Sequence, residues 1–67
     1  MNEDVSMVLR LRYDEERKRS IAFADFSYDN QFWTYSEDDL PSPLNEEDTG
    51  EFRERAWAAL VDHVSVH

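Results

Sequence analysis

Apolar and polar residues alternate in the first third of this chain. Between Val5 and Tyr13 the odd-numbered residues are all apolar, whereas Arg10 and Arg12 occupy even-numbered positions. Successive side chains of a strand point to opposite faces of a sheet, so this alternation predicts a half-buried strand over about residues 5–13.

A second strand is predicted over residues 19–28, where the segment IAFADFSY is rich in β-forming residues. Its apolar residues fall into two sets, because Ile21 and Phe23 share one face and Phe26 shares the other with Tyr28. A β-bulge near Ala24 and Asp25 would bring the two sets to the same face.

Polar connections flank this second strand. The first, DEERKR, has no Asn-Gly or Asp-Gly pair and favours a loop of four or more residues, whereas YDNQ is typical of a turn. FWTYS then predicts a third strand over about residues 31–36, with Phe32 on the face opposite Trp33 and Tyr35. An antiparallel meander is the simplest arrangement of the three strands.

The segment SEDDLPSPLNEED follows, and its two prolines fit neither a sheet ladder nor a helix interior. It predicts a loop over residues 37–48. Leu40 and Leu44 are expected to anchor this loop to the core, which leaves an acidic triplet exposed on either side of the prolines.

From Asp48 onward the apolar residues follow a helical period. Asp48 or Thr49 is suited to cap a helix, and Glu51 lies in the first turn, where the helix dipole favours a carboxylate. A helix over about residues 49–65 would gather one apolar arc, which consists of Phe52, Ala56, Ala59, Leu60, His63 and Val64. The order β-β-β-α predicts an α+β fold, a small two-layer sandwich that forms a single domain over residues 1–67.

Composition places this domain among small folded proteins. The 67 residues include no cysteine, which excludes disulfide crosslinks. They include nine aromatic residues, so the composition is too apolar for a disordered tail. The first residues, MNEDVSM, carry acids where a signal peptide carries positive charge, and no apolar run reaches the roughly 18 residues that span a membrane. We therefore expect a cytoplasmic protein.

The net charge of −9 is unevenly distributed. Between Ser20 and Phe52 there are nine acidic residues and no basic one. Nucleic acids and anionic membranes are bound through Lys and Arg, so neither is expected as a direct ligand. A basic, nucleic-acid-binding protein or complex is the expected partner, and a second copy of the chain is a further candidate.

The sequence offers little for catalysis or metal binding. No nucleophile, base and orienting group have the arrangement of a catalytic triad, and the segment NEEDTGE fails the spacing of a calcium-binding EF-hand loop. His63 and His67 are four residues apart, but a zinc site needs three or four ligands. We expect a protein that is not an enzyme and has no metal or cofactor.

The acidic residues therefore have two interpretations. They form either a solvated, solubilising loop or a surface that imitates the phosphates of DNA. For the second, Trp33 or Tyr35 would anchor the partner, whereas Phe32 would belong to the core. The candidate partner-binding residues are Asp25, Asp29, Trp33, Tyr35, Glu37, Asp38, Asp39, Glu46, Glu47, Asp48 and Glu51.

Two functional hypotheses follow. In the first, the protein is an inhibitor encoded by a phage or mobile element that acts in a bacterial host cell as a DNA mimic, against CRISPR, restriction or transcription machinery. In the second, FADF at residues 23–26 and DTGEFRERAWAAL at residues 48–60 resemble the sheet-and-helix half of HicB-type antitoxins. That resemblance implies an antitoxin-like adaptor that binds another protein. A structural component is a third alternative.

Overall fold

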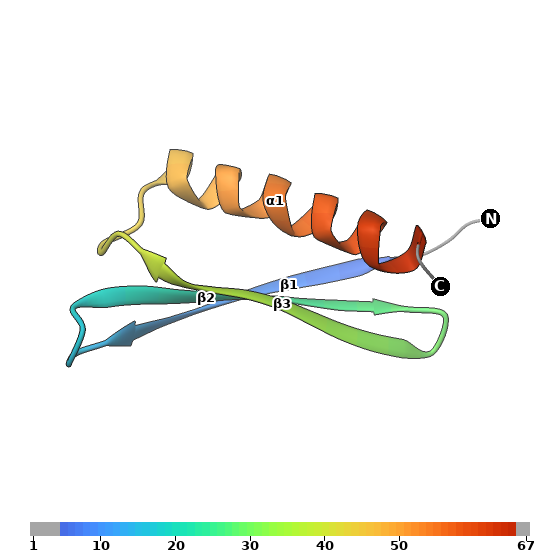
Figure 1. Cartoon of the computed structure of the whole chain (residues 1–67), viewed down its shortest axis with the longest axis horizontal. Coiled ribbons are helices and arrows are strands. Elements are labelled where there is room, and N and C mark those ends of the chain that lie inside the picture. The colour runs from blue at the N-terminus through green and yellow to red at the C-terminus, as the bar shows by residue number, and fades with distance from the viewer. Residues whose placement is uncertain (1–4, 66–67) are drawn as a thin grey trace.

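A three-stranded sheet and one helix form the two layers of the protein. The structure is a computed structural model that describes residues 5–65. In chain order its elements are β1 (Ser6–Asp14), β2 (Arg19–Tyr28), β3 (Gln31–Leu40) and α1 (Glu46–Ser65) (Figure 1). The strands are antiparallel in the order β1-β2-β3, and α1 packs on one face of the sheet. The predicted α+β meander with a C-terminal helix is confirmed.

The first two strands match their predicted bounds to within a residue, but the predicted loop over residues 37–48 is wrong. β3 continues through the first acidic triplet to Leu40, and α1 begins at Glu46 rather than at residue 49. Residues 41–45, which contain both prolines, form the connection. The second acidic triplet is therefore the first turn of the helix.

Both strand connections have the predicted character. The turn between β1 and β2 is four residues long, and the Lys18 N–H donates to the Asp14 carbonyl oxygen over 2.7 Å. Between β2 and β3, Asp29 and Asn30 adopt φ angles of 52° and 59°. Two successive positive φ angles are typical of a type I′ turn, whose twist matches that of a hairpin.

The β-bulge predicted near Ala24 and Asp25 is absent, because β2 alternates regularly through this region and pairs in unbroken register with β1. Ala22, Ala24 and Phe26 are buried beneath the helix. Ile21 and Phe23 lie on the opposite, open face and need not join them.

A register shift occurs instead in β3, next to its C-terminal end. β3 advances three residues, from Glu37 to Leu40, while β2 advances two, from Ala22 to Ser20. The extra residue is a β-bulge. It turns Leu40 toward the helix, the side on which Glu37 already lies by alternation, and leaves residues 38–39 exposed.

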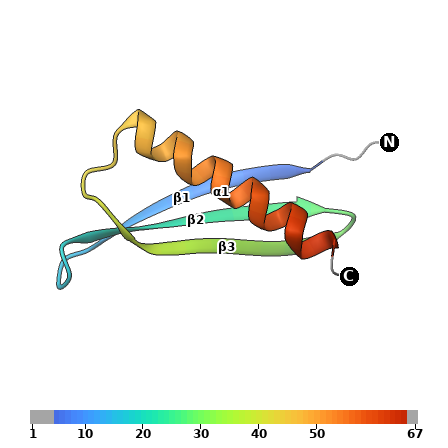
Figure 2. The same ribbon diagram turned by 45° about the horizontal axis from the view of Figure 1, so that its top comes forward.

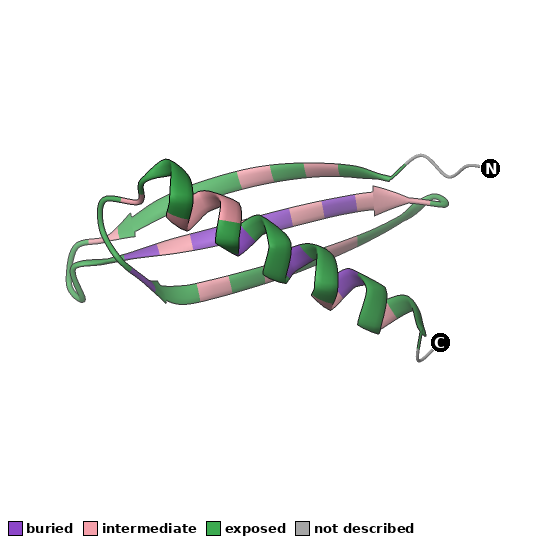
Figure 3. Cartoon of the chain, turned by 90° about the horizontal axis from the view of Figure 1, so that it is seen from above, coloured by how far each residue is buried: buried purple, intermediate pink, exposed green. Residues whose placement is uncertain are grey.

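The core lies between α1 and the middle of the sheet. Figure 3 shows the buried positions along β2 and along the inner side of the helix. Ala24 of the sheet and Ala56 of the helix are completely buried, and small side chains at these positions allow the two layers to approach closely. The buried apolar residues are Ala22, Ala24, Phe26, Leu40, Phe52, Ala56 and Leu60. The helix crosses the sheet obliquely and lies over β2 and β3, whereas β1 extends beyond it (Figure 2).

Candidate protein-binding surface

Four of the predicted binding acids are paired within the chain. On the open face of the sheet, Asp25 accepts hydrogen bonds from Arg10 over 2.6 and 3.2 Å and from the Thr34 hydroxyl over 2.9 Å. The hydrogen bonds from Arg10 and then from Thr34 hold the pKa of Asp25 below its usual value. The Arg10 guanidinium also lies 4.6 Å from the ring centre of Phe23. Asp25 thus belongs to a neutralised polar cluster.

Glu37 has a similar role on the helix-facing side. Its carboxylate accepts two hydrogen bonds from Arg55, each 2.8 Å long, and one from the Tyr35 hydroxyl over 2.6 Å. The pKa of Glu37 is lowered mainly by the Arg55 hydrogen bonds, and the pKa of Tyr35 is raised because its hydroxyl donates to Glu37. This carboxylate joins β3 to the helix.

Asp38 and Asp39 are also paired, but in exposed positions. Arg17 lies 3.5 Å from Asp38, and Arg19 lies 3.0 Å from Asp39. The aspartate side chains are 67% and 79% exposed. Exposed pairs contribute little to stability, so a basic partner can replace these arginines at small cost.

The beginning of α1 holds a capping arrangement centred on Asn45, not on the predicted Asp48 or Thr49. The Asp48 N–H donates to the Asn45 side-chain oxygen over 2.7 Å, and the Thr49 hydroxyl donates to the Asn45 carbonyl oxygen over 3.0 Å. The Asp48 carboxylate accepts from the Asn45 N–H over 3.5 Å. Asp48 therefore reinforces the helix end, where carboxylates are also favoured by the dipole.

The remaining acids of α1 point into solvent. Glu47, Glu51, Glu54 and Asp62 fall on the outer side of the helix, away from its buried stripe. We call these four residues the outer ridge. Within residues 5–65 none of them makes an ion pair, and neither do Glu46 and Asp29. Glu51 is the one of these acids that acts on a base, because it adds to the larger effect of Glu37 in raising the pKa of Arg55.

The aromatic residues have the opposite arrangement to the one predicted. Trp33 is half-buried, and its ring stacks on that of His63 with the ring centres 4.4 Å apart and an angle of 8° between the ring planes. Tyr35 is half-buried with its ring 5.8 Å from that of Phe52. Phe32, predicted in the core, is 83% exposed on the open face. Trp33 and Tyr35 therefore pack beneath the helix, and Phe32 is more exposed than Tyr13 and Trp57, the other exposed aromatic residues of the described chain.

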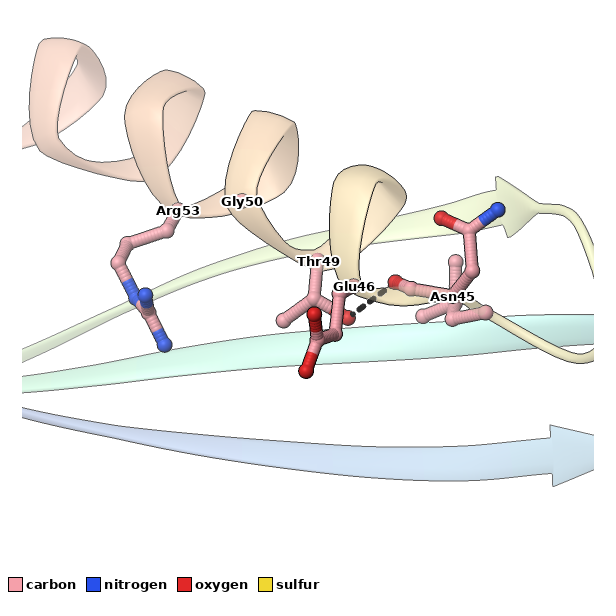
Figure 4. Close-up of a pocket in the computed structure, with 6 residues that line it drawn as sticks. Asn45, Glu46, Thr49, Gly50 and Arg53 are labelled. Atoms are coloured by element: carbon pink, nitrogen blue, oxygen red, sulfur yellow. Dashed lines mark hydrogen bonds between the residues drawn. The ribbon is translucent and has the colours of Figure 1, made fainter.

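A shallow depression of about 480 Å³ lies beside the first turns of α1. Figure 4 shows the Arg53 side chain and the Glu46 carboxylate directed toward the sheet from the helix. The lining residues are Leu44, Asn45, Glu46, Thr49, Gly50 and Arg53. They include one acid and one base but no arrangement of nucleophile and general base.

Two further observations concern metal binding and membrane spanning. Among residues 5–65, no three His, Cys, Asp or Glu side chains gather closely enough to hold a metal ion. His67, considered with His63 as a metal-binding pair, lies outside the described residues. No helix in the described part of the chain is long and apolar enough to cross a membrane.

Comparison with known protein families, curated proteins and solved structures finds no match. The functional argument therefore depends on the surface itself. Two acids of the outer ridge, Glu54 and Asp62, were not among the predicted binding residues. The signal that identifies Glu54 is its helical spacing from Glu47 and Glu51, by seven and three residues.

Proposed function

We propose that the protein is a non-enzymatic inhibitor that binds a basic nucleic-acid-binding protein or complex and occupies its nucleic-acid site. The observation that carries the proposal is the outer ridge of α1, whose carboxylates lack ion pairs and stand on a rigid helix. A rigid charged surface loses little conformational entropy when it binds.

The spacing of the outer ridge supports an imitation of phosphates. With a rise of about 1.5 Å per residue, Glu47, Glu51 and Glu54 are separated along the helix axis by roughly 6 and 4.5 Å. Each strand of duplex DNA carries one phosphate per roughly 3.4 Å of axis. The carboxylates are thus spaced more widely along the axis than the phosphates of one DNA strand, by less than a factor of two.

The paired acids extend this surface. Asp38 and Asp39 lie on β3, and the arginines that neutralise them are themselves exposed. A cationic groove on the partner would compete with Arg17 and Arg19 for these carboxylates. Long-range attraction between surfaces of opposite charge accelerates association and depends strongly on salt.

The partner class follows from the charge. CRISPR effectors, restriction enzymes and transcription machinery all handle nucleic acids through basic surfaces, and small acidic proteins of phages and mobile elements are suited to block them. In this proposal the protein acts in the cytoplasm of a bacterial host cell. An antitoxin-like adaptor is the second candidate, favoured by the exposed ring of Phe32.

The experiment is capture of proteins from a bacterial lysate on the immobilised protein at low salt, followed by competition with duplex DNA. We expect a basic protein to be retained and then released by DNA. For that protein, the variant E47Q/E51Q is expected to bind about fivefold to tenfold more weakly, with a smaller dependence on salt.

The matched control is E15Q/E16Q, which removes the same charge from the exposed turn between β1 and β2, outside the outer ridge. It should bind nearly as well as the unmodified protein. Retention of a partner that DNA cannot displace, with equal affinity for both variants, would exclude the DNA mimic and favour the adaptor.

A further inference from the structure

Several large apolar side chains remain exposed on the helix-facing side of the sheet. Leu11 and Tyr13 of β1 are 59% and 50% exposed, and Trp57 and Val64 of α1 are 37% and 45% exposed. These are four of the eight large hydrophobic residues exposed in the described part of the chain. We call them, with the half-buried Met7 and Leu9, the β1–α1 apolar surface.

Register and helical period place the two parts of this surface on the same side of the molecule. Leu9 and Leu11 pair with Ala24 and Ala22, which face the helix, so the odd residues of β1 face the helix side too. Because Arg55 reaches Glu37 on β3, the flank of α1 that bears Arg55 faces β3.

Trp57 and Val64, which are seven residues apart, fall on the other flank of α1, across the buried stripe from Arg55. Since β1 and β3 are the opposite edges of the sheet, this flank faces the side of β1. The helix packs against β2 and β3, and the positions along β1 are exposed or half-buried (Figure 3).

The two edges of the sheet differ in how well they are protected against pairing with another strand. The β3 edge carries a bulge and three consecutive acids, Glu37, Asp38 and Asp39, which oppose a second acidic chain. In contrast, β1 pairs regularly over its nine residues and contains no proline. A long, regular and partly apolar edge is a template for strand addition.

Charge identifies the occupant. Each chain carries a net charge of −9, so two copies repel each other wherever acids face acids. Between Ser6 and Tyr13 there is no acid, and Arg10 and Arg12 lie on the other face of the strand. Two copies can therefore approach through β1, whereas a basic partner is attracted to the acidic surfaces elsewhere.

We propose that a second copy of this chain pairs antiparallel with β1 about a two-fold axis. The product is a continuous six-stranded sheet with both helices on one face. The β1–α1 apolar surfaces of the two copies meet across the axis, where each residue contacts the same set on its partner. The small core of the single chain, with three alanines among its seven buried apolar residues, gains apolar burial in this way.

The proposal does not rest on the inhibitory function, because it uses the flank of α1 that carries Trp57 and Val64, and the outer ridge lies on the solvent side of the helix. It is tested by sedimentation equilibrium of the purified chain over a wide range of concentration. We expect a species of twice the 8.0 kDa chain mass. Hydrogen exchange of the β1 amides should slow as the protein concentration rises, because pairing supplies acceptors for their outward N–H groups.

A matched pair of substitutions locates the interface. L11K is expected to weaken dimerisation about a hundredfold, since a two-fold interface contains the lysine twice. V8K is the control, because Val8 is 58% exposed on the same strand but on the opposite face. A second pair on the helix, V64K against A58K, distinguishes the flank that faces β1 from the outer surface.

Clear results would overturn the proposal. A monomer at every concentration would exclude pairing of two copies through the β1–α1 apolar surface. A dimer equally sensitive to L11K and V8K, or one without concentration-dependent protection of β1, would place the contact elsewhere. If L11K unfolds the chain on dissociation, the V64K and A58K pair still separates the two faces through the concentration dependence of thermal unfolding.

Discussion

Arg55 of α1 donates two hydrogen bonds to Glu37 of β3, from Nε and from Nη2, each 2.8 Å long. This bidentate pair joins the helix to the edge strand at the residue next to the bulge. An acid that the sequence places in an exposed loop is therefore a structural residue. Glu37 secures the helix, whereas the carboxylates of the outer ridge make no ion pair among the described residues.

Replacing Glu37 with glutamine should lower the free energy of unfolding by about 1–2 kcal/mol. The neutral amide cannot accept both charged hydrogen bonds from Arg55, and the loss is limited because the Arg55 side chain is 45% exposed. Urea unfolding measures the change. The control is E47Q on the outer ridge, for which we expect less than about 0.5 kcal/mol. Equal effects of the two substitutions would contradict a structural role for Glu37.

The contribution of Glu37 should depend on pH in a defined direction. Its pKa in the folded protein lies below its usual value of 4.5, mainly because of Arg55. A carboxyl group with a depressed pKa stabilises the fold fully above its unfolded pKa, and this contribution is lost as the pH falls through the folded pKa. The unmodified protein is therefore expected to have a higher free energy of unfolding than E37Q at neutral pH. This difference should shrink as the pH falls below 4.5. Urea unfolding of both proteins at neutral pH and near pH 3 tests this, and an unchanged difference would refute it.

The layers and strand order could be predicted from the sequence because alternation and helical period are local signals. The end of β3 could not. Trp33, Tyr35 and Glu37 share one face of the strand, but a glutamate continues an inward-facing set only if a base is supplied to it. That base is Arg55, 18 residues further along the chain. Three consecutive acids followed by proline look like a loop when this partner is unknown.

The inner face of β3 was also beyond local reasoning. Alternation separates Phe32 from Trp33 and Tyr35, but it does not say which set meets the helix. The choice depends on β2, where Ala24 lies opposite Tyr35 and leaves room for the helix. The same limit applies to the binding acids, because sequence distinguishes neither Asp25 nor Glu37 from the unpaired carboxylates of the outer ridge.

Removal of the helix cap should destabilise the protein without altering its charge. Asn45→Ala deletes the oxygen that accepts the Asp48 N–H over 2.7 Å, and an expected loss of about 1 kcal/mol follows from the unsatisfied donor. Thermal unfolding followed by circular dichroism measures this loss. Asn45→Ser restores a capping oxygen and should recover most of the stability. A serine variant as unstable as the alanine variant would show that the cap is not the cause.

Gly50→Ala should stabilise the protein. Gly50 lies inside α1, has no positive φ angle, and a Cβ atom at this position would meet no atom within 4 Å. Glycine in a helix interior costs about 0.5–1 kcal/mol relative to alanine, because the unfolded chain has more conformations to lose. The substitution should therefore raise the free energy of unfolding, measured by urea unfolding, by this amount.

Gly50 also lines the depression beside α1, so the same variant tests whether that depression matters for binding. We expect G50A to be more stable and to retain its partner as well as the unmodified protein does, because the outer ridge and the β1–α1 apolar surface are intact. A less stable variant would contradict the open helical position described for Gly50.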